Sequence, residues 1–174
     1  GAPNQATDGR RQEQEAGALV ISRMTKSHFS PELLTFLRAL KRHNDRDWFR
    51  AHRATYDEHV HAPMVAVVEA LAQDLRRFAP ELSADPRRSI YRIYRDTRFS
   101  ADKSPLKTHI AAVFPRRDSP RHESAGLYFE VAHDWVWVGG GLYMPTSPGL
   151  HRVRERIAAD QRAFERVITS PSFK

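Results

Sequence analysis

The sequence GLYFEVAHDWVWV at residues 126–138 decides the fold class, because it predicts a β-hairpin. Residues 126–131 and 135–138 are rich in β-branched and aromatic side chains, which favour strands, and a short polar turn at 133–134 separates them. Strands joined by so short a connection pair antiparallel. The glycines at 139–141 are expected to end the second strand or to form a bulge in it.

Two further strands are expected before the hairpin. Residues 89–95, SIYRIYR, interleave polar side chains with β-branched and aromatic ones, and residues 108–114, THIAAVF, form a second, more apolar run. Residues 96–107 are polar and predict a loop, and residues 115–124 predict a charged, exposed connection. The sequence therefore predicts a mainly antiparallel sheet of about four strands.

The N-terminal half predicts helices. The sequence SPE at residues 30–32 combines an N-cap hydroxyl, a proline in the first turn and an acid that faces the helix dipole. Leucine and phenylalanine then recur at helical spacing, which predicts a helix over 31–42. Asp45 can cap a second helix over 46–59, and Pro63 is expected to open or kink a third.

The C-terminal part returns to helical patterns. Ser147 and Pro148 predict the start of a helix, and Asp160 can cap a final short one. The expected fold is α+β, with N-terminal helices packed on the sheet and a C-terminal helix after it. We expect residues 1–28 to form a disordered tail and residues 29–174 to form a single domain.

The composition narrows the class of protein. The 174 residues include 28 basic and 21 acidic side chains, which gives a net charge of +7 that favours anionic partners. Cysteine is absent, which excludes disulfides, thiolate nucleophiles and cysteine-based metal sites. No apolar run approaches the roughly 20 residues of a membrane span, and no secretory signal pattern is present. We therefore expect a cytoplasmic protein with no membrane partner.

The densest polar segment, residues 92–109, is the candidate functional site. Its basic side chains are expected to converge on one concave site: Arg92, Arg95, Arg98, Lys103, Lys107 and His109. Guanidinium groups offer forked donors and ammonium groups offer point charges to an oxyanion, so a small phosphorylated ligand is the expected partner. Asp96 and Asp102 leave an alternative open, in which they pair with these bases and only hold the loop in place.

Several motifs occur in a characteristic order along the chain. They are Phe29-Ser30, Leu33-Leu34, Asn44 with RDWF at 46–49, RIYRDTRFS at 92–100, Asp102-Lys103, Pro105, KTH at 107–109 and GGGLYMP at 139–145. Together they resemble the pattern of an uncharacterised microbial family, DUF2461, from about residue 29 to the end of the chain. His43, where members often have asparagine, is a small departure.

The resemblance implies no activity, because none is established for the family. Family members resume after a stretch like residues 169–174 with a further C-terminal segment. The resemblance therefore implies that this chain lacks that segment, together with part of the sheet and of any site.

Three classes of function remain open. Asp96 or Asp102 are weak candidates for a general base with His109 as partner, which would make the protein an enzyme acting on the anion. The same basic residues could instead bind a small ligand without chemistry, or bind the backbone of a nucleic acid. In the third class, the Arg–Asp network only builds a structural or interaction domain. The binding of a small anion is the preferred interpretation.

Other patterns predict less. The nine histidines show no metal-ligand spacing, and no fingerprint of a cofactor is present, so we expect neither a metal nor a cofactor. Trp135 and Trp137 share one strand face and are expected to pack in the core rather than to stack on bases. Trp48 and Phe49 are expected to pack helix against sheet, with Asn44 and Asp47 at the helix start. The oligomeric state is left open.

Overall fold

The computed structural model describes residues 28–171 and 173. Of the predicted tail, residues 1–27 lie outside the described part of the chain. The elements, in chain order, are helices α2 (Pro31–Arg42), α3 (Arg46–Ala51) and α4 (Arg53–Tyr56), the π-helical turn η1 (Asp57–His61), helices α5 (Ala62–Phe78) and α6 (Pro86–Ser89), strands β1 (His109–Pro115), β2 (Ala125–Ala132) and β3 (Val136–Leu142), and helices α7 (Ser147–Ala159) and α8 (Gln161–Ile168). This is the α+β class that the sequence predicts.

The sheet has three antiparallel strands in the order β1-β2-β3. The hairpin is confirmed, with Val131 opposite Val136 and Leu127 opposite Gly140. The three glycines neither end β3 nor form a bulge in it, because the register with β2 continues unbroken to Leu142. That expectation was wrong because glycine weakens a strand without removing its backbone donors and acceptors, and β2 pairs with all three glycines.

The fourth predicted strand, residues 89–95, is absent from the described sheet. Ser89 ends helix α6, and the segment after it makes only isolated bridges, from Ile90 to Ala112 and from Tyr94 to Leu106. Ile90 and Tyr94 are four positions apart, whereas their partners Ala112 and Leu106 are six positions apart. The register of the pairing therefore changes between the two bridges. The change interrupts the ladder, and the segment forms no regular strand.

The N-terminal helices begin where predicted, although the Ser30 hydroxyl accepts no capping hydrogen bond at the start of α2. Helix α2 covers the predicted residues, and the Asp45 carboxylate accepts a 2.7 Å hydrogen bond from the Trp48 backbone N–H at the start of α3. The predicted helix over 46–59 is interrupted at His52, whose ring nitrogen Nδ1 lies 2.8 Å from the carbonyl oxygen of Trp48. Side chains that bond nearby carbonyl groups compete with the helix in this way. The chain then passes through the π-helical turn into α5, where Pro63 lies in the first turn, as predicted.

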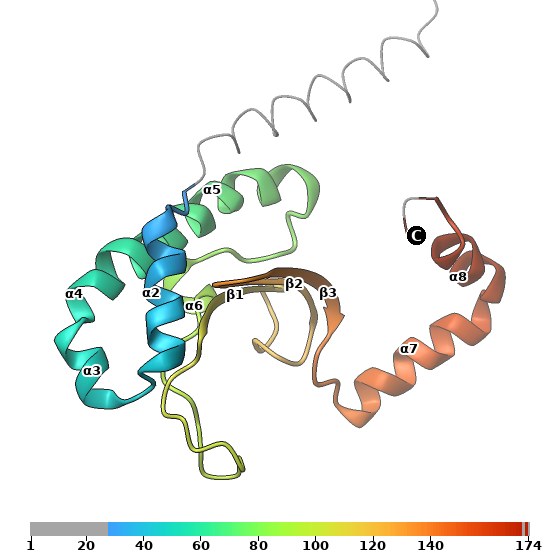
Figure 1. The fold of residues 1–174 in the computed structure, drawn as a ribbon. Coiled ribbons are helices and arrows are strands. Elements are labelled where there is room, and N and C mark those ends of the chain that lie inside the picture. The colour runs from blue at the N-terminus through green and yellow to red at the C-terminus, as the bar shows by residue number, and fades with distance from the viewer. Residues whose placement is uncertain (1–27, 172, 174) are drawn as a thin grey trace, which may run out of the picture.

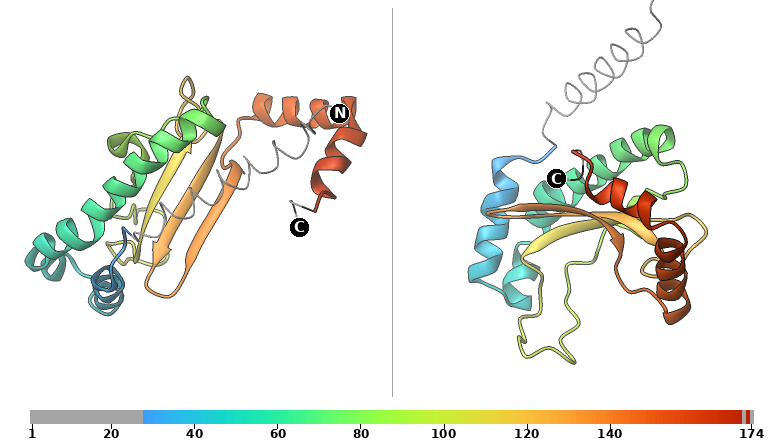
Figure 2. Two further views of the ribbon diagram at one scale, coloured as in Figure 1. Left: turned by 90° about the horizontal axis from the view of Figure 1, so that it is seen from above. Right: turned by 90° about the vertical axis from the view of Figure 1, so that its right-hand side faces the viewer.

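The core lies between the N-terminal helices and one face of the sheet (Figure 2). Leu33, Leu37 and Leu40 of α2 are fully buried, together with apolar residues of α5. Ile110, Ala112 and Phe114 of β1 lie on the same core. Phe49 is buried as predicted, whereas Trp48 is half-buried and stacks on His52 with ring centroids 4.1 Å apart.

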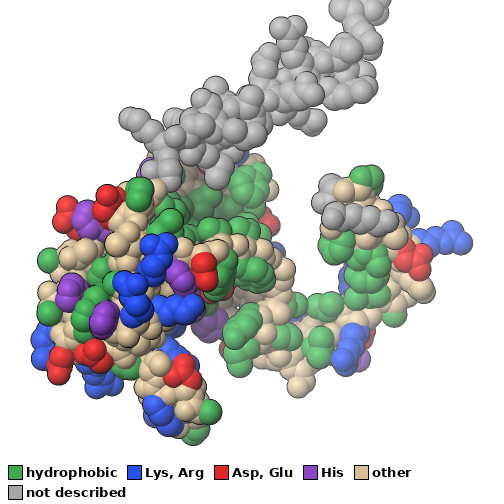
Figure 3. Space-filling view, viewed as in Figure 1, with side chains coloured by type: hydrophobic (Ala, Val, Ile, Leu, Met, Phe, Trp, Pro, Cys, Tyr) green, Lys and Arg blue, Asp and Glu red, His purple; other side chains and the backbone are tan. Residues whose placement is uncertain are grey.

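In the described part of the chain the opposite face of the sheet is open toward β3, although Ala111 and Ala132 on the same face are buried. Trp135 and Trp137 are 45% and 52% exposed, so the expectation that they pack in the core was wrong. Helices α7 and α8 extend away from the end of β3 and contain no buried residue (Figure 1). Their exposed apolar side chains gather on α8 in particular (Figure 3). The alternation along β3 identified a shared face but not whether another element covers it.

Candidate functional site

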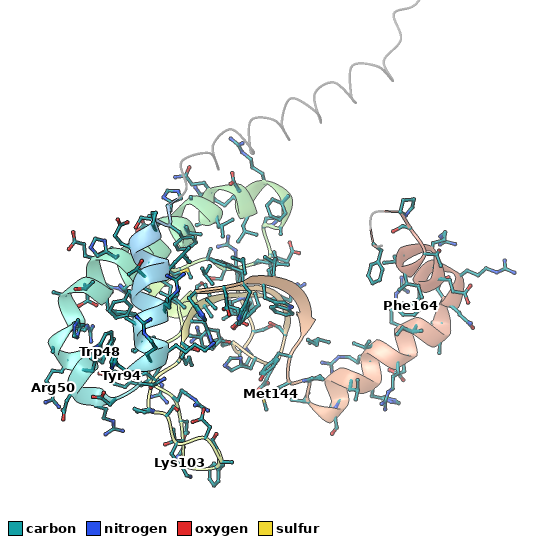
Figure 4. All side chains as sticks on the ribbon, viewed as in Figure 1. Trp48, Arg50, Tyr94, Lys103, Met144 and Phe164 are labelled. Atoms are coloured by element: carbon teal, nitrogen blue, oxygen red, sulfur yellow. The ribbon has the colours of Figure 1, made fainter. Side chains whose placement is uncertain are left out.

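Residues 95–105 form a polar loop beyond the bridge from Tyr94 to Leu106, and we call it the projecting loop. Its charged side chains bond largely to one another. The Arg95 guanidinium forms an ion pair with Asp102 and donates a 3.2 Å hydrogen bond to the Ser100 hydroxyl. The Arg98 and Asp96 side chains form a second pair at 2.7 Å. Lys103, at the tip of the projecting loop, donates a 3.0 Å hydrogen bond to the carbonyl oxygen of Thr97 (Figure 4).

These pairings weaken the loop carboxylates as bases. The Arg98 side chain holds the pKa of Asp96 at about 2. Hydrogen bonds from Ser104, and then from Arg95, lower the pKa of Asp102 as well. A general base is most effective with a pKa near the working pH, so both carboxylates are better suited to holding the loop than to taking up a proton.

Asn44 anchors the end of this loop to the helices. Its side-chain amide donates a 2.9 Å hydrogen bond to the carbonyl oxygen of Leu106, and its amide oxygen accepts a 3.0 Å bond from the Leu106 backbone N–H. Leu106 itself is almost fully buried. The two bonds fix the backbone immediately before Lys107 and therefore position the start of β1.

A cluster of polar side chains gathers on the open face of the sheet. We call it the sheet-face cluster, and it consists of Tyr91, Lys107, His109, Arg121, Tyr128 and Glu130. Side chains alternate across a strand, so Tyr128 and Glu130 share the face opposite to the buried Val131. Glu130 lies at the centre, with its Oε2 atom 3.2 Å from His109 Nε2, and it accepts a hydrogen bond from the Tyr128 hydroxyl.

Two further cations of the cluster lie against the ring of Tyr91. Lys107 Nζ is 4.9 Å from the ring centroid and donates a 2.9 Å hydrogen bond to the carbonyl oxygen of Arg92. The guanidinium carbon of Arg121 is 4.0 Å from the same centroid, and this side chain also donates a 2.6 Å bond to the Ser89 carbonyl. Arg121 Nε is buried and has no hydrogen-bond partner among the described residues.

The electrostatics of the cluster favour an anion. Burial lowers the pKa of Lys107, and the nearby charges of Arg92 and Arg121 lower it further. Burial also lowers the pKa values of His109 and Arg121, although Glu130 opposes the shift at His109. A positive charge in such surroundings is stabilised by a nearby negative one, and Glu130 is the only carboxylate paired within the cluster.

Aromatic rings border the cluster toward β3. The Trp137 ring lies 5.5 Å from that of Tyr128, and the Trp135 ring lies 6.3 Å from that of His109, measured between centroids. A Cβ atom on Gly139 would lie 2.4 Å from the Trp137 ring, so the glycine makes room for the indole. The open face therefore combines positive charge with exposed flat rings.

The structure divides the predicted site residues into two groups. Lys107 and His109 belong to the sheet-face cluster. Arg92 is close enough to lower the pKa of Lys107, and Arg95 is close enough to lower the pKa of His109. Arg98 and Lys103 lie on the projecting loop and bond to the loop itself.

The sequence interpretation missed Tyr91, Arg121, Tyr128 and Glu130. Strand alternation in the hairpin places Tyr128 and Glu130 on one face and was a usable signal. Arg121 comes from the connection at 115–124, where no pattern in the sequence indicated a role.

The described residues show neither a metal-ligating cluster nor a membrane-spanning helix. No group of three or more metal-ligating side chains comes together in this part of the chain. No described helix has both the length and the apolar character required to cross a membrane.

Comparison with known proteins gives one match. The family model described as "Conserved hypothetical protein (DUF2461)" matches residues 32–174. No curated protein and no solved structure matches the chain significantly.

Proposed function

This chain belongs to the DUF2461 family of conserved hypothetical proteins, and we propose that it binds a small phosphorylated molecule on its sheet-face cluster. The observation that carries the proposal is the gathering of Lys107 and Arg121 at the ring of Tyr91, with His109 paired to Glu130 on the same partly buried surface. A phosphate group would neutralise Lys107 and Arg121 and accept their hydrogen bonds.

The unpaired Arg121 Nε atom supports this assignment. Buried polar atoms in proteins nearly always have a partner, and a buried donor without one loses the hydrogen bond that water would give it. A ligand oxygen at this point would supply that bond. The donor lies beside Tyr91, whose ring also contacts Lys107, and the charge of Arg121 lowers the pKa of Lys107, so the two cations lie near one another.

A small ligand fits the charge pattern better than a polymer. Asp96 and Asp102 neutralise Arg98 and Arg95 on the projecting loop, so the loop offers little unpaired positive charge to a continuous phosphate backbone. The aromatic rings of Trp135 and Trp137 add a flat apolar border that suits the body of a nucleotide or a related metabolite. We also propose a cytoplasmic location, since phosphorylated metabolites of this kind are made and used there.

Acid–base chemistry, if the ligand undergoes any, is assigned to His109. Its pKa is held below the ordinary value, which leaves the imidazole neutral near pH 7 and able to accept a proton. Glu130 contacts both His109 and Tyr128 and so orients the imidazole. In this proposal Asp96 and Asp102 hold the loop.

The test is a thermal-shift screen with nucleotides, sugar phosphates and oligonucleotides at two salt concentrations, followed by calorimetry of any hit. Lys107→Met and Arg121→Gln should each weaken the binding of a metabolite by about tenfold, as expected for losing one charge-assisted hydrogen bond. Arg98→Gln is the matched control, because it removes one positive charge from the loop without touching the cluster. Equal losses in all three variants would contradict the proposed site.

Nucleic-acid binding is the second candidate, and the exposure of Trp135 and Trp137 favours it. Aromatic side chains on an open sheet face can stack on unpaired bases. This candidate predicts binding of single-stranded oligonucleotides that weakens steeply as salt rises, together with quenching of tryptophan fluorescence. If neither metabolites nor oligonucleotides bind, the cluster is a structural element of an interaction domain.

A further inference from the structure

A second basic site lies where helices α3 and α4 meet Tyr94. A cavity of 280 Å³ is lined by Arg46, Phe49, Arg50, Arg53 and Tyr94, and we call it the arginine pocket. Its volume is close to the lower limit of about 300 Å³ that is typical of small-ligand sites. Arg50 and Tyr94 lie near each other where the projecting loop meets helix α3 (Figure 4).

The three arginines of the pocket come from one stretch of helix. Arg46 and Arg50 are one helical turn apart on α3, and Arg53 begins α4 after the interruption at His52. Residues four apart share a helix face, so the first two guanidinium groups are directed to the same side. Arg53 follows Arg50 by three residues, a spacing that also shares a helix face, and it lines the same cavity.

Much of the hydrogen-bonding capacity of these arginines is unused. Arg46 has no ion pair within the described part of the chain, and the Arg50–Asp47 pair at 3.1 Å is almost fully exposed, so it holds Arg50 weakly. Arg53 uses its Nε atom for both oxygens of Asp57, at 2.9 and 2.8 Å. Its two terminal nitrogens are therefore available for a ligand.

Arg53 is also held in place before any ligand arrives. Its guanidinium carbon lies 5.8 Å from the ring centroids of both Phe49 and Tyr56, in addition to the bonds with Asp57. A donor that is already oriented loses less conformational entropy on binding. The buried Phe49 and the partly exposed Tyr94 pack edge to face, with centroids 5.8 Å apart, and give the pocket aromatic walls.

We propose that the arginine pocket is a second anion site, which takes a small phosphate monoester of an aromatic or similarly flat molecule between Arg46, Arg50 and Arg53, with its ring against Tyr94. Forked guanidinium groups match the oxygens of a phosphate dianion. Asp47 and Asp57 pair with Arg50 and Arg53 and reduce the net positive charge around the pocket, which disfavours the continuous charge of a polymer. An adjoining cavity of 620 Å³ shares Arg53 and Tyr94 and adds Arg87 and Arg92, which leaves room for a larger body on the ligand.

The experiment follows the arginine side-chain N–H signals by NMR during titration with inorganic phosphate and then with phenyl phosphate, at constant ionic strength. The wild-type protein should show saturable shifts at Arg46, Arg50 and Arg53. The same shifts should persist in the Lys107→Met/Arg121→Gln variant, which separates this pocket from the sheet-face cluster. Disappearance of the response in that variant would overturn the second site and leave the first one standing.

Two paired variants test the specificity of the pocket. Arg46→Gln/Arg50→Gln should weaken phosphate binding at least tenfold, because it removes two charge-assisted contacts. Arg76→Gln/Arg77→Gln removes the same charge from exposed positions at the end of α5 and should leave the affinity within about twofold. Equal weakening by both pairs would show only general attraction of anions to a basic protein and would overturn the proposal.

The ring contact has its own measurement. Phenyl phosphate should bind several-fold more tightly than inorganic phosphate, and Tyr94→Ala should remove that difference while the protein keeps its cooperative melting transition. Equal affinity of the two probes in the wild-type protein would contradict the choice of an aromatic monoester.

Discussion

The described chain has two regions that differ in burial. Every buried residue lies between Leu33 and Ala132, whereas strand β3 and helices α7 and α8 contribute none. The first region places helices on one face of β1 and β2 and packs them tightly. The second region adds a strand and two helices whose apolar side chains remain exposed.

The difference shows how stability and binding are divided in this molecule. Hydrophobic burial, which contributes most to folding, comes from the face of the sheet that the helices cover. The opposite face carries Lys107, His109 and Glu130, which would cost free energy if a helix buried them without partners. Substitutions in the two regions should therefore have very different effects.

The largest contrast is expected between the core and the edge strand. Leu37 is fully buried, so Leu37→Ala should lower the free energy of unfolding by about 2–5 kcal/mol through lost contacts and the remaining cavity. Val138 is 72% exposed, so Val138→Ala should change it by less than about 0.5 kcal/mol. Urea unfolding measures both. A comparable loss at Val138 would mean that β3 is covered in solution.

A smaller effect is expected where the core region anchors the loop. Asn44→Ala removes both hydrogen bonds to the backbone of Leu106 and leaves these buried groups unpaired, which should cost about 1–3 kcal/mol. The exposed Asp47 is the control, and Asp47→Ala should change stability by no more than about 0.5 kcal/mol.

The Asn44 variant also tests whether the loop anchor in the core region affects binding at the sheet-face cluster. Loss of the anchor should increase backbone motion at Lys107, which NMR relaxation can measure, and should weaken ligand binding at the sheet-face cluster. Unchanged relaxation at this position would show that the register of β1 alone positions the lysine.

The smallest effect is a dependence on pH. Folding holds the pKa of His109 below its ordinary value of about 6.5, chiefly through burial. As the pH falls through 6.5 the unfolded chain takes up the proton first, so stability that is present above that pH decreases below it. His109→Gln should flatten this part of the stability profile. If the wild-type protein instead gains stability on acidification relative to the variant, the attraction of Glu130 raises the pKa of His109 by more than burial lowers it.

Local patterns predicted most of the elements. The start of α2, the Asp45 cap, β1 and the hairpin depend on neighbouring residues and were all visible in the sequence. The segment 89–95 also has strand-like residues, but a strand needs a partner in register, and its two bridges lie in different registers. Pairing over that distance is not encoded in local propensity.

The candidate site was only partly predictable for a similar reason. The dense basic segment identified Lys107 and His109, yet its other charged residues largely satisfy one another within the loop. Glu130 and Arg121 join the cluster through tertiary contacts that cross the sheet and a long connection. Arg46, Arg50 and Arg53 have the spacing of an ordinary exposed helix face, and only the approach of Tyr94 from a distant segment shows that they line a cavity.

The uncharged edge of β3 has a consequence for handling the protein. Its sequence, VWVGGGL, contains no charge and no proline, and within the described chain no strand pairs with its outer edge. Native proteins usually protect such edges with lysine, proline or a bulge, because bare edges bind to one another. Here the main opposing force between molecules is the net charge of +7, and salt weakens that force as the screening length shortens to about 8 Å at 0.15 M. The protein should therefore be most soluble in dilute buffer and begin to associate as salt is added.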